Sequence, residues 1–498
     1  MNIRLPHAHG FTRREFLAKS TVSAAVLPAI AGFSPSVEAA SKSSPAAFAP
    51  STDFLETARS TAQWIDTVRR DDARGAWWLP DPDHPERQTT VSAANAIYSG
   101  SAGTVLFFLQ LADVTGDATY RERARQGASY LAATWRDLLG QPEGGVLSGK
   151  GLNLSLYGGL SGTAFVLHQT ASATGDAQLL QASRDATDAV VGAARAAGTG
   201  LAWSGAPGIA ADGSIVLYLL YAARAFDEPR YLETARKAAD HILELAINDP
   251  RGGSSWRGFP PLRGLPQDAY FPNFEGGTAG VAFILARVYD ATRQEKYLAA
   301  AKQGALHLTR IATVRGDAAL IPYRFPDLPD LYYLGFCHGP AGTARTFYEL
   351  HRITREREYQ QWTERLARGV IESGVPENLT PGFWNVACQC CGSAGEVDFF
   401  LGLWAASGRQ EYLDFAQRVA RHLVSHASNI DGKGARWYQA WTRVKPWDVN
   451  AETGYSVGAS GIGSALLHAH VAAKGRYRAI LLPDNPFPSS REGREHTA

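Results

Sequence analysis

A Gly-x-x-Gly turn followed by an apolar run recurs seven times along this chain of 498 residues. Successive turns are about 60 residues apart, a longer period than most solenoid repeats have. The runs, such as 104–111, are apolar on nearly every face, which is typical of helices buried on all sides. The repeat therefore predicts seven buried helices, each opened by a turn at residues 100–103, 159–162, 205–208, 277–280, 339–342, 392–395 or 458–461.

A second pattern precedes each turn, with apolar residues three or four apart and Arg, Lys, Glu or Gln between them. It predicts amphipathic helices with one solvated face, beginning near Phe54, Tyr120, Leu179, Tyr231, Tyr297, Tyr359 and Tyr412. Seven apolar helices need cover on all sides. An open solenoid would need polar terminal repeats, and the first and last units are ordinary. We therefore predict an all-α fold, an α/α toroid of seven helix pairs, with short hairpins in the loops 144–157 and 436–450.

The four cysteines of the chain all lie at the fifth and sixth turns, which a ring makes neighbours: Cys337, Cys388, Cys390 and Cys391. A helix N-terminus favours the thiolate, the form that binds metal. Cys337, Cys390 and Cys391 would make a tetrahedral Zn²⁺ site with one open position, as catalytic zinc sites have. His338 or Cys388 could instead close the site, and disulfides are the alternative without metal, although adjacent cysteines bond each other only with strain.

The seven units, with Cys337 before the fifth turn and Cys390 and Cys391 before the sixth, resemble the lanthionine synthetase C (LanC-like) cyclase family over residues 51–480. The resemblance implies zinc at the mouth of the toroid, bound by Cys337, Cys390 and Cys391. Most members have His where Cys391 stands, and a subset has the same three cysteines. The implied reaction activates a thiol of a peptide or small molecule as a zinc thiolate. The thiolate then adds to a dehydroamino acid, forming a thioether.

Two supporting positions of the family differ in this sequence. The family places a His just before the fourth turn, where this chain has Gly276, and an acidic residue before the second, where it has Ser155. Protonation of the enolate after addition needs a general acid. Glu275, beside the vacant His position, and His338, beside Cys337, are the candidates for that catalytic role. Without such help, the chain would be a non-catalytic, zinc-stabilised binding protein.

The N-terminal region has the pattern of a twin-arginine signal peptide over residues 1–39, with a linker at 40–50. It predicts export to the periplasm or the extracellular space. The apolar run at 21–33 is too short to remain as a membrane anchor. A net charge of +1 indicates no nucleic-acid partner. We expect a monomer that acts on a peptide or small thiol, with a C-terminal tail at 481–498.

A third hypothesis is a carbohydrate-active enzyme, because α/α toroids also host glycosidases and lyases. It requires a pair of carboxylates about 5–10 Å apart across the mouth. The sequence offers no clear pair: Asp81, Asp83, His84, Glu396 and Asp398 are interpreted as ordinary loop and helix residues. Loop residues expected near the mouth could contact substrate or simply pack: Trp203, Trp256, Arg257, Tyr323, Arg324, Trp437, Tyr438 and Trp447.

Overall fold

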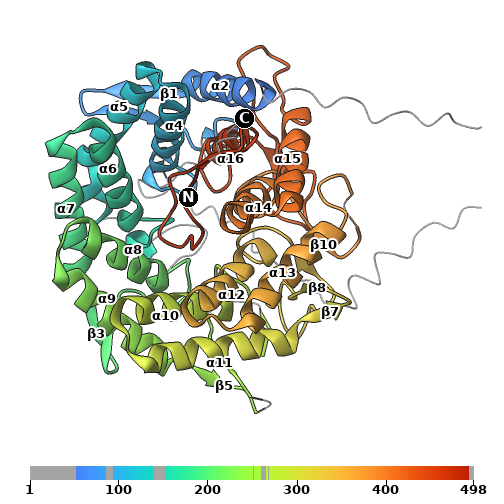
Figure 1. Ribbon diagram of the computed structural model, residues 1–498. Helices are drawn as coiled ribbons and strands as arrows, with labels where there is room; N and C mark the ends of the chain where they lie inside the picture. Colours follow the sequence, from blue (N-terminus) through green and yellow to red (C-terminus); the bar gives the residue numbers. More distant parts are fainter. Residues whose placement is uncertain are drawn as a thin grey trace, which may run out of the picture.

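The computed structural model describes residues 52–492, apart from 86–93, 140–151, 251, 260–264, 267 and 379. Two concentric layers of helices form a closed ring (Figure 1). In this part of the chain, no helix is both long and apolar enough to cross a membrane. The predicted signal peptide, linker and residues 493–498 lie outside the described residues, as does most of the predicted hairpin at 144–157.

Seven inner helices surround the centre of the ring, and an N-terminal glycine precedes six of them. Their bounds are α4 (Ser101–Thr115), α6 (Leu160–Thr174), α8 (Asp212–Ala225), α10 (Thr278–Thr292), α12 (Pro340–Thr354), α14 (Ser393–Ser407) and α16 (Ala459–Ala472). The second glycine of each turn lets two segments of backbone touch. A Cβ at Gly280, for example, would lie 2.0 Å from the carbonyl oxygen of Phe274. This close approach explains why the turns recur at this point of each unit.

Seven outer helices cover the inner ones, with their charged faces in solvent. Their bounds are α2 (Thr52–Thr67), α5 (Ala118–Thr134), α7 (Ala177–Gly192), α9 (Pro229–Glu244), α11 (Glu295–Ile311), α13 (Arg357–Glu372) and α15 (Gln410–Ser425). Each inner helix from α4 to α14 packs mainly against the outer helix that follows it, and α2 packs against α16. The packing unit is therefore inner then outer, and the first helix closes the ring on the last. This corrects our expectation of a pair formed by an outer helix and the next inner one.

The third inner helix begins later than its glycines predicted. We placed the turn at 205–208, but α8 begins at Asp212. Gly213 takes the role of the second glycine, since its Cβ would lie 2.5 Å from the carbonyl oxygen of Pro207. The carboxylate of Asp212 accepts hydrogen bonds from the backbone N–H groups of Trp203 (3.0 Å) and Gly205 (2.9 Å), so the predicted turn is a loop bound to the true helix start.

Short two-stranded sheets occupy the loops. Their strands are β1 (Arg69–Asp72), β2 (Gly75–Trp78), β3 (Arg195–Ala197), β4 (Gly200–Ala202), β5 (Ile247–Asn248), β6 (Ser254–Ser255), β7 (Thr313–Arg315), β8 (Ala318–Leu320), β9 (Tyr332–Tyr333), β10 (Phe383–Trp384), β11 (Gln439–Ala440), β12 (Val449–Asn450), β13 (Tyr477–Arg478) and β14 (Ser490–Arg491). All pairs are antiparallel except β9 with β10, which join the loops before α12 and α14. The pairing of β11 with β12 confirms the hairpin predicted at 436–450.

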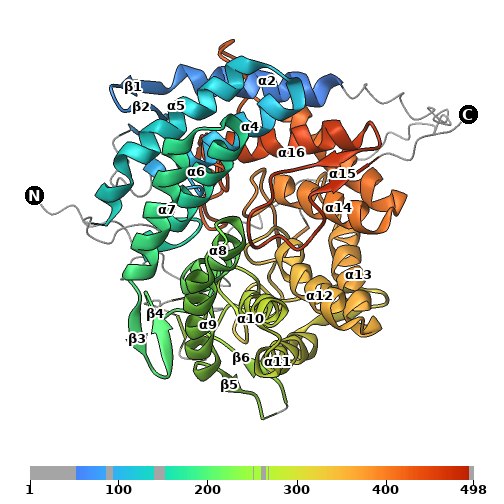
Figure 2. The same cartoon turned by 60° about the vertical axis from the view of Figure 1, so that its left-hand side comes forward.

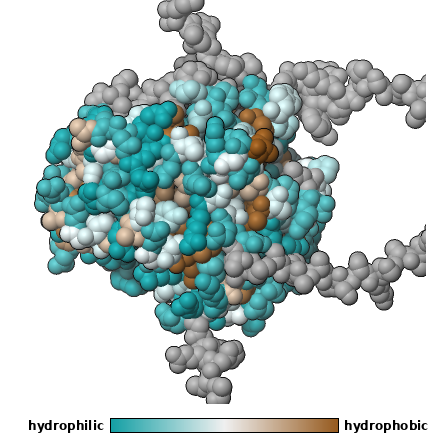
Figure 3. Space-filling model, turned by 90° about the horizontal axis from the view of Figure 1, so that it is seen from above, coloured by the Kyte–Doolittle hydropathy of each residue, from teal (hydrophilic) through white to brown (hydrophobic). Residues whose placement is uncertain are grey.

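The chain beyond α16 returns to the interior of the ring, where both views place it (Figures 1 and 2). Asp484 is fully buried and Phe487 is nearly so, and Phe487 stacks against Tyr348 of α12 with 4.6 Å between ring centroids. The segment predicted as a tail from residue 481 therefore completes the core. The outside of the ring, seen from above in Figure 3, is mainly hydrophilic with small separate apolar patches.

Candidate metal centre

Three cysteine thiols converge where the loops before α12 and α14 meet. Their Sγ atoms all lie within 4.8 Å of one another, and the Sγ atoms of Cys337 and Cys391 are 3.3 Å apart. Backbone hydrogen bonds fix this approach: Cys337 N donates to the carbonyl of Cys390 (3.0 Å), and Cys390 N donates to that of Ser456 (2.8 Å). The ring thus brings together the three residues that the sequence singled out, in a group that could hold a metal ion.

The cluster opens on one side. Cys337 and Cys390 are buried, whereas Cys391 is half-buried. The fourth cysteine, Cys388, is buried behind the cluster, where its Sγ accepts a hydrogen bond from Cys391 N (3.5 Å), and it is not one of the three mutually close thiols. All four thiols are free, so the structure does not contain the disulfides of the alternative hypothesis. Three soft sulfur donors with access beside Cys391 fit a tetrahedral Zn²⁺ that keeps one position for an outside ligand.

The cluster favours one thiolate electrostatically. Hydrogen bonds from the thiols of Cys337 and Cys391 lower the pKa of Cys390 well below its usual value. The Tyr98 hydroxyl also donates to Cys390 Sγ, at 3.4 Å. Tyr98 lies just before the first turn, so the first unit also contributes a donor to the site. Nothing in the sequence near Tyr98 indicated this contact, which depends on ring closure.

Glu275 and His338, the two catalytic candidates, lie beside the cluster and beside each other. Glu275, His338 and Cys337 form a second group of ligand atoms within 4.8 Å, and His338 Nε2 is 3.8 Å from Glu275 Oε2. Glu275 N also donates to the carbonyl of Cys337 (2.8 Å). Burial raises the pKa of Glu275 well above its usual value, and burial lowers the pKa of His338 to about 4. Both environments favour uncharged side chains.

Aromatic rings surround the His338 imidazole. Ring centroids lie 5.0 Å away for Tyr323, 5.1 Å for Phe271, 5.9 Å for Tyr333 and 6.0 Å for Phe259. Tyr323 and Tyr333 stack face to face, with centroids 3.9 Å apart. The prediction that Tyr323 lies near the mouth is thus consistent with its position beside His338, and the rings limit how the imidazole can move.

The two positions that lack the family's acid and base groups are filled by packing. A Cβ on Gly276 would lie 1.9 Å from the ring of Phe259, so that ring occupies the space a side chain would need. Ser155 is buried, and its hydroxyl accepts a hydrogen bond from Gly158 N (3.3 Å). Neither Gly276 nor Ser155 therefore places an acid or a base at these positions.

Three of the tryptophans that could contact substrate or pack are packed in the core. Trp203, Trp256 and Trp437 are buried, and each indole N–H donates to a carbonyl near the end of an outer helix, at 2.8–2.9 Å. The remaining members of that set also have defined places. Arg257 stacks on Tyr270, Arg324 pairs with Asp327, and Tyr438 and Trp447 are exposed.

The carboxylates interpreted as ordinary are mostly structural too. His84 Nδ1 lies 3.3 Å from Asp81, Asp83 accepts from Ala451 N, and Glu396 is fully buried. Asp398 is different, because it belongs to a polar network inside the ring. It accepts from Gln389 (2.7 Å) and pairs with His468 Nδ1 (2.7 Å).

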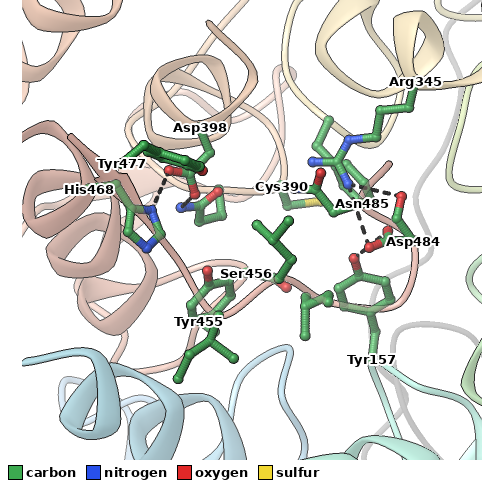
Figure 4. A pocket seen from close by; sticks show the side chains of 15 residues that line it. Tyr157, Arg345, Cys390, Asp398, Tyr455, Ser456, His468, Tyr477, Asp484 and Asn485 are labelled. Atoms are coloured by element: carbon green, nitrogen blue, oxygen red, sulfur yellow. Dashed lines mark hydrogen bonds and ion pairs between the residues drawn. The ribbon is translucent and has the colours of Figure 1, made fainter. Parts of the chain in front are cut away.

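That network lines a cavity of about 40 Å³ behind Cys390, room for about three water molecules (Figure 4). On the opposite wall, Asp484 accepts from the Tyr157 hydroxyl (2.7 Å) and pairs with Arg345 (3.5 Å). The sequence analysis missed His468, Arg345 and Asp484, because they come from three distant segments that meet only inside the ring.

Together, the fold and the site define a closed α/α toroid with a cysteine cluster at its mouth that could hold a metal ion. The family model for lanthionine synthetase C-like proteins matches residues 92–482, and the chain belongs to this family. No curated protein sequence matches it significantly.

The chain is also similar to several solved structures. Nisin cyclase is similar with a TM-score of 0.55 and 12% identity, over 83% of this chain and 92% of that one. An unsaturated glucuronyl hydrolase specific for heparin has a TM-score of 0.45 and 10% identity, over 85% and 98%. An α-1,6-mannanase of Salegentibacter sp. HEL1_6 has a TM-score of 0.44 and 14% identity, over 84% and 98%. At these identities, the nisin cyclase match supports the fold alone.

Proposed function

We propose that this protein binds one Zn²⁺ through Cys337, Cys390 and Cys391 and activates the thiol of a peptide or small molecule for addition to a dehydroamino acid. The convergence of three thiols, two buried and one half-buried, carries this proposal. Bound zinc would supply the Lewis acidity that converts an incoming thiol to a thiolate near neutral pH. Membership of the LanC-like family supports the same chemistry.

The chain's own groups have separate tasks in this proposal. Two hydrogen bonds hold Cys390 in place: the Tyr98 hydroxyl donates to its Sγ, and its backbone N–H donates to the carbonyl of Ser456. When sulfur bonds to the β-carbon of the acceptor, the π electrons move to the α-carbon side, and that carbon must take up a proton. Glu275 and His338 are the proton-carrying side chains that share the cluster with Cys337, so we assign them this transfer.

One observation favours the second candidate, a zinc-stabilised binding protein. Phe259 fills the place of the family's missing His at Gly276, so the usual acid or base is replaced by an apolar ring. The carbohydrate-active hypothesis has less support. The two helix carboxylates named in the sequence analysis do not form an open pair, since Glu396 is fully buried and Asp398 is bonded to His468.

Metal content and thiol addition test the proposal together. Purified protein should contain close to one zinc per chain, and C390A should lose the metal. C388A is the matched control, because it removes the cysteine outside the group and should keep the metal. Addition of glutathione to a dehydroalanine peptide should be lost in C390A and reduced at least tenfold in E275Q or H338Q. Zinc retention in C390A would refute the ligand set. If C390A loses zinc but the wild type shows no measurable addition of glutathione, the result would favour the zinc-stabilised binding protein.

We also propose export by the twin-arginine route, on the pattern in residues 1–39. Fusion of these residues to a reporter enzyme tests it: R13K/R14K should abolish export, and unchanged export would contradict the proposal.

A further inference from the structure

Exposed apolar side chains gather on one hairpin of the described chain. We call residues 438–450, which include β11 and β12, the mouth hairpin. All of residues 441–449 are exposed. The large apolar side chains among them are Trp441 (43% exposed), Val444 (48%), Trp447 (76%) and Val449 (43%). Soluble proteins expose single apolar side chains commonly, but a cluster of four within nine residues marks an interaction surface.

The base of the mouth hairpin is bonded to residues beside the cysteine cluster. Gln439 accepts from Cys388 N (3.0 Å) and donates to the carbonyl of Val457. The Trp441 ring packs 6.5 Å from that of Tyr98, whose hydroxyl reaches Cys390 Sγ. The Trp441 indole N–H also donates to the buried Glu452. The hairpin is therefore fixed at one end to the site and exposed at the other.

The hairpin also carries positive charge toward the mouth. Arg443 and Lys445 lie between the apolar residues, and Asp448 is the one acidic residue of the exposed stretch 441–449. Burial raises the pKa of Tyr333, and the positive charge of Arg443 opposes this effect. Tyr333 packs against His338, so the charge of Arg443 acts on a ring that borders the site, and Trp441 packs against Tyr98.

We propose that the mouth hairpin binds an acidic, apolar segment of the peptide whose thiol reacts at the cluster. Trp447 and Val444 would bury aromatic or aliphatic side chains, and Arg443 and Lys445 would pair with carboxylates. Tryptophan and arginine are the side chains that most often dominate binding energy at interfaces, and charge complementarity gives such contacts their specificity. The proposal rests on the thiol-activating function above, and it adds the surface that would hold a peptide substrate and the chemistry of the segment bound there.

Fluorescence anisotropy with cysteine-free peptides tests binding apart from chemistry. Three labelled dodecapeptides serve as probes. In the first, Phe or Leu alternates with Glu, and in the second, Phe or Leu alternates with Lys. In the third, Ser alternates with Glu. The Phe/Leu/Glu probe should bind the zinc-containing wild type at least tenfold more tightly than the other two. V444S/W447S and R443E/K445E should each weaken its binding at least tenfold.

Matched controls lie elsewhere on the surface. I430S removes an apolar side chain that is 91% exposed, and K474E/R476E reverses two exposed cations. Both should bind the probe within twofold of wild type. So should C390A, which separates this proposal from the zinc chemistry.

Several results would overturn the proposal. The first is equal binding of the Glu and Lys probes, and the second is binding that the hairpin variants do not affect. The third is sedimentation with phosphatidylglycerol vesicles that the same variants abolish while no probe binds, because exposed Trp with Arg and Lys also suits a membrane interface. Failure of the wild type to bind any probe, with glutathione addition intact, would refute the hairpin proposal alone. Intact probe binding without addition would refute the catalytic function alone.

Discussion

Glu396 should make the stability of this protein fall between pH 5 and pH 8. It lies in the first turn of α14, shortly after Cys390 and Cys391, and is fully buried. Burial raises its pKa from 4.5 to about 8, against smaller opposing effects of Asn385 and Arg418. The folded protein thus holds the proton more tightly than the unfolded chain. The stabilisation is complete below about pH 4.5 and is lost as the pH rises through about 8.

The size of the effect follows from the shift of the pKa. A shift of this size corresponds to a total of about 5 kcal/mol, of which about 3 kcal/mol would be lost between pH 5 and pH 8. Glutamine keeps the shape without the ionisation, so E396Q should lack this part of the pH dependence. Urea unfolding of zinc-loaded protein at several pH values measures it. E358Q, on the exposed face of α13, is the matched control and should keep the wild-type slope. Equal slopes for E396Q and wild type would refute the reasoning.

Three further changes test the fold and the site. G342A should cost about 2–4 kcal/mol, seen as a lower Tm, because its Cβ would lie 2.0 Å from the Phe336 carbonyl oxygen, while G192A, with open space around it, should cost nothing. D484A should lower the free energy of unfolding by about 3–5 kcal/mol, measured by urea unfolding, because Arg345 loses its buried partner. It should also speed proteolysis of the C-terminal segment, followed by mass spectrometry. Removing zinc with a strong chelator should lower the Tm of the wild type. If zinc is present at roughly 1,000 times its Kd, the loss of stability should be about 4 kcal/mol. The Tm of C337A should not change in the same thermal scan.

The ring and the cysteine cluster could be predicted because each depends on a pattern that repeats along the chain. The glycines mark places where backbone must touch backbone, and seven such places with apolar runs leave few architectures. The third turn shows the limit of this reasoning. The spacing at 205–208 is the same as in the other turns, but Asp212 binds the backbone of that loop and starts the helix itself. The Gly-x-x-Gly spacing alone does not show which carboxylate will bind the backbone of the turn.

The rest of the site depends on contacts between distant segments. Trp256 is a loop tryptophan of the kind that often binds substrate, yet its indole N–H donates a hydrogen bond to the carbonyl of Ile242. The C-terminal residues were predicted to be a tail because their partners are distant in the sequence. Tyr157 comes from the second unit and Arg345 from the fifth. Polar residues without periodicity give no signal of such burial. Only the closed ring brings them together.

Closure of the ring by α2 and α16 also constrains how the protein is made. The two helices pack together although about 400 residues separate them in the chain. During translation, α2 emerges long before its partner, so its apolar face has no native cover until nearly the whole chain has been synthesised. Such late, non-local contacts slow folding and leave nascent chains prone to aggregation. The protein should therefore depend on chaperones that protect α2 until the last helix leaves the ribosome.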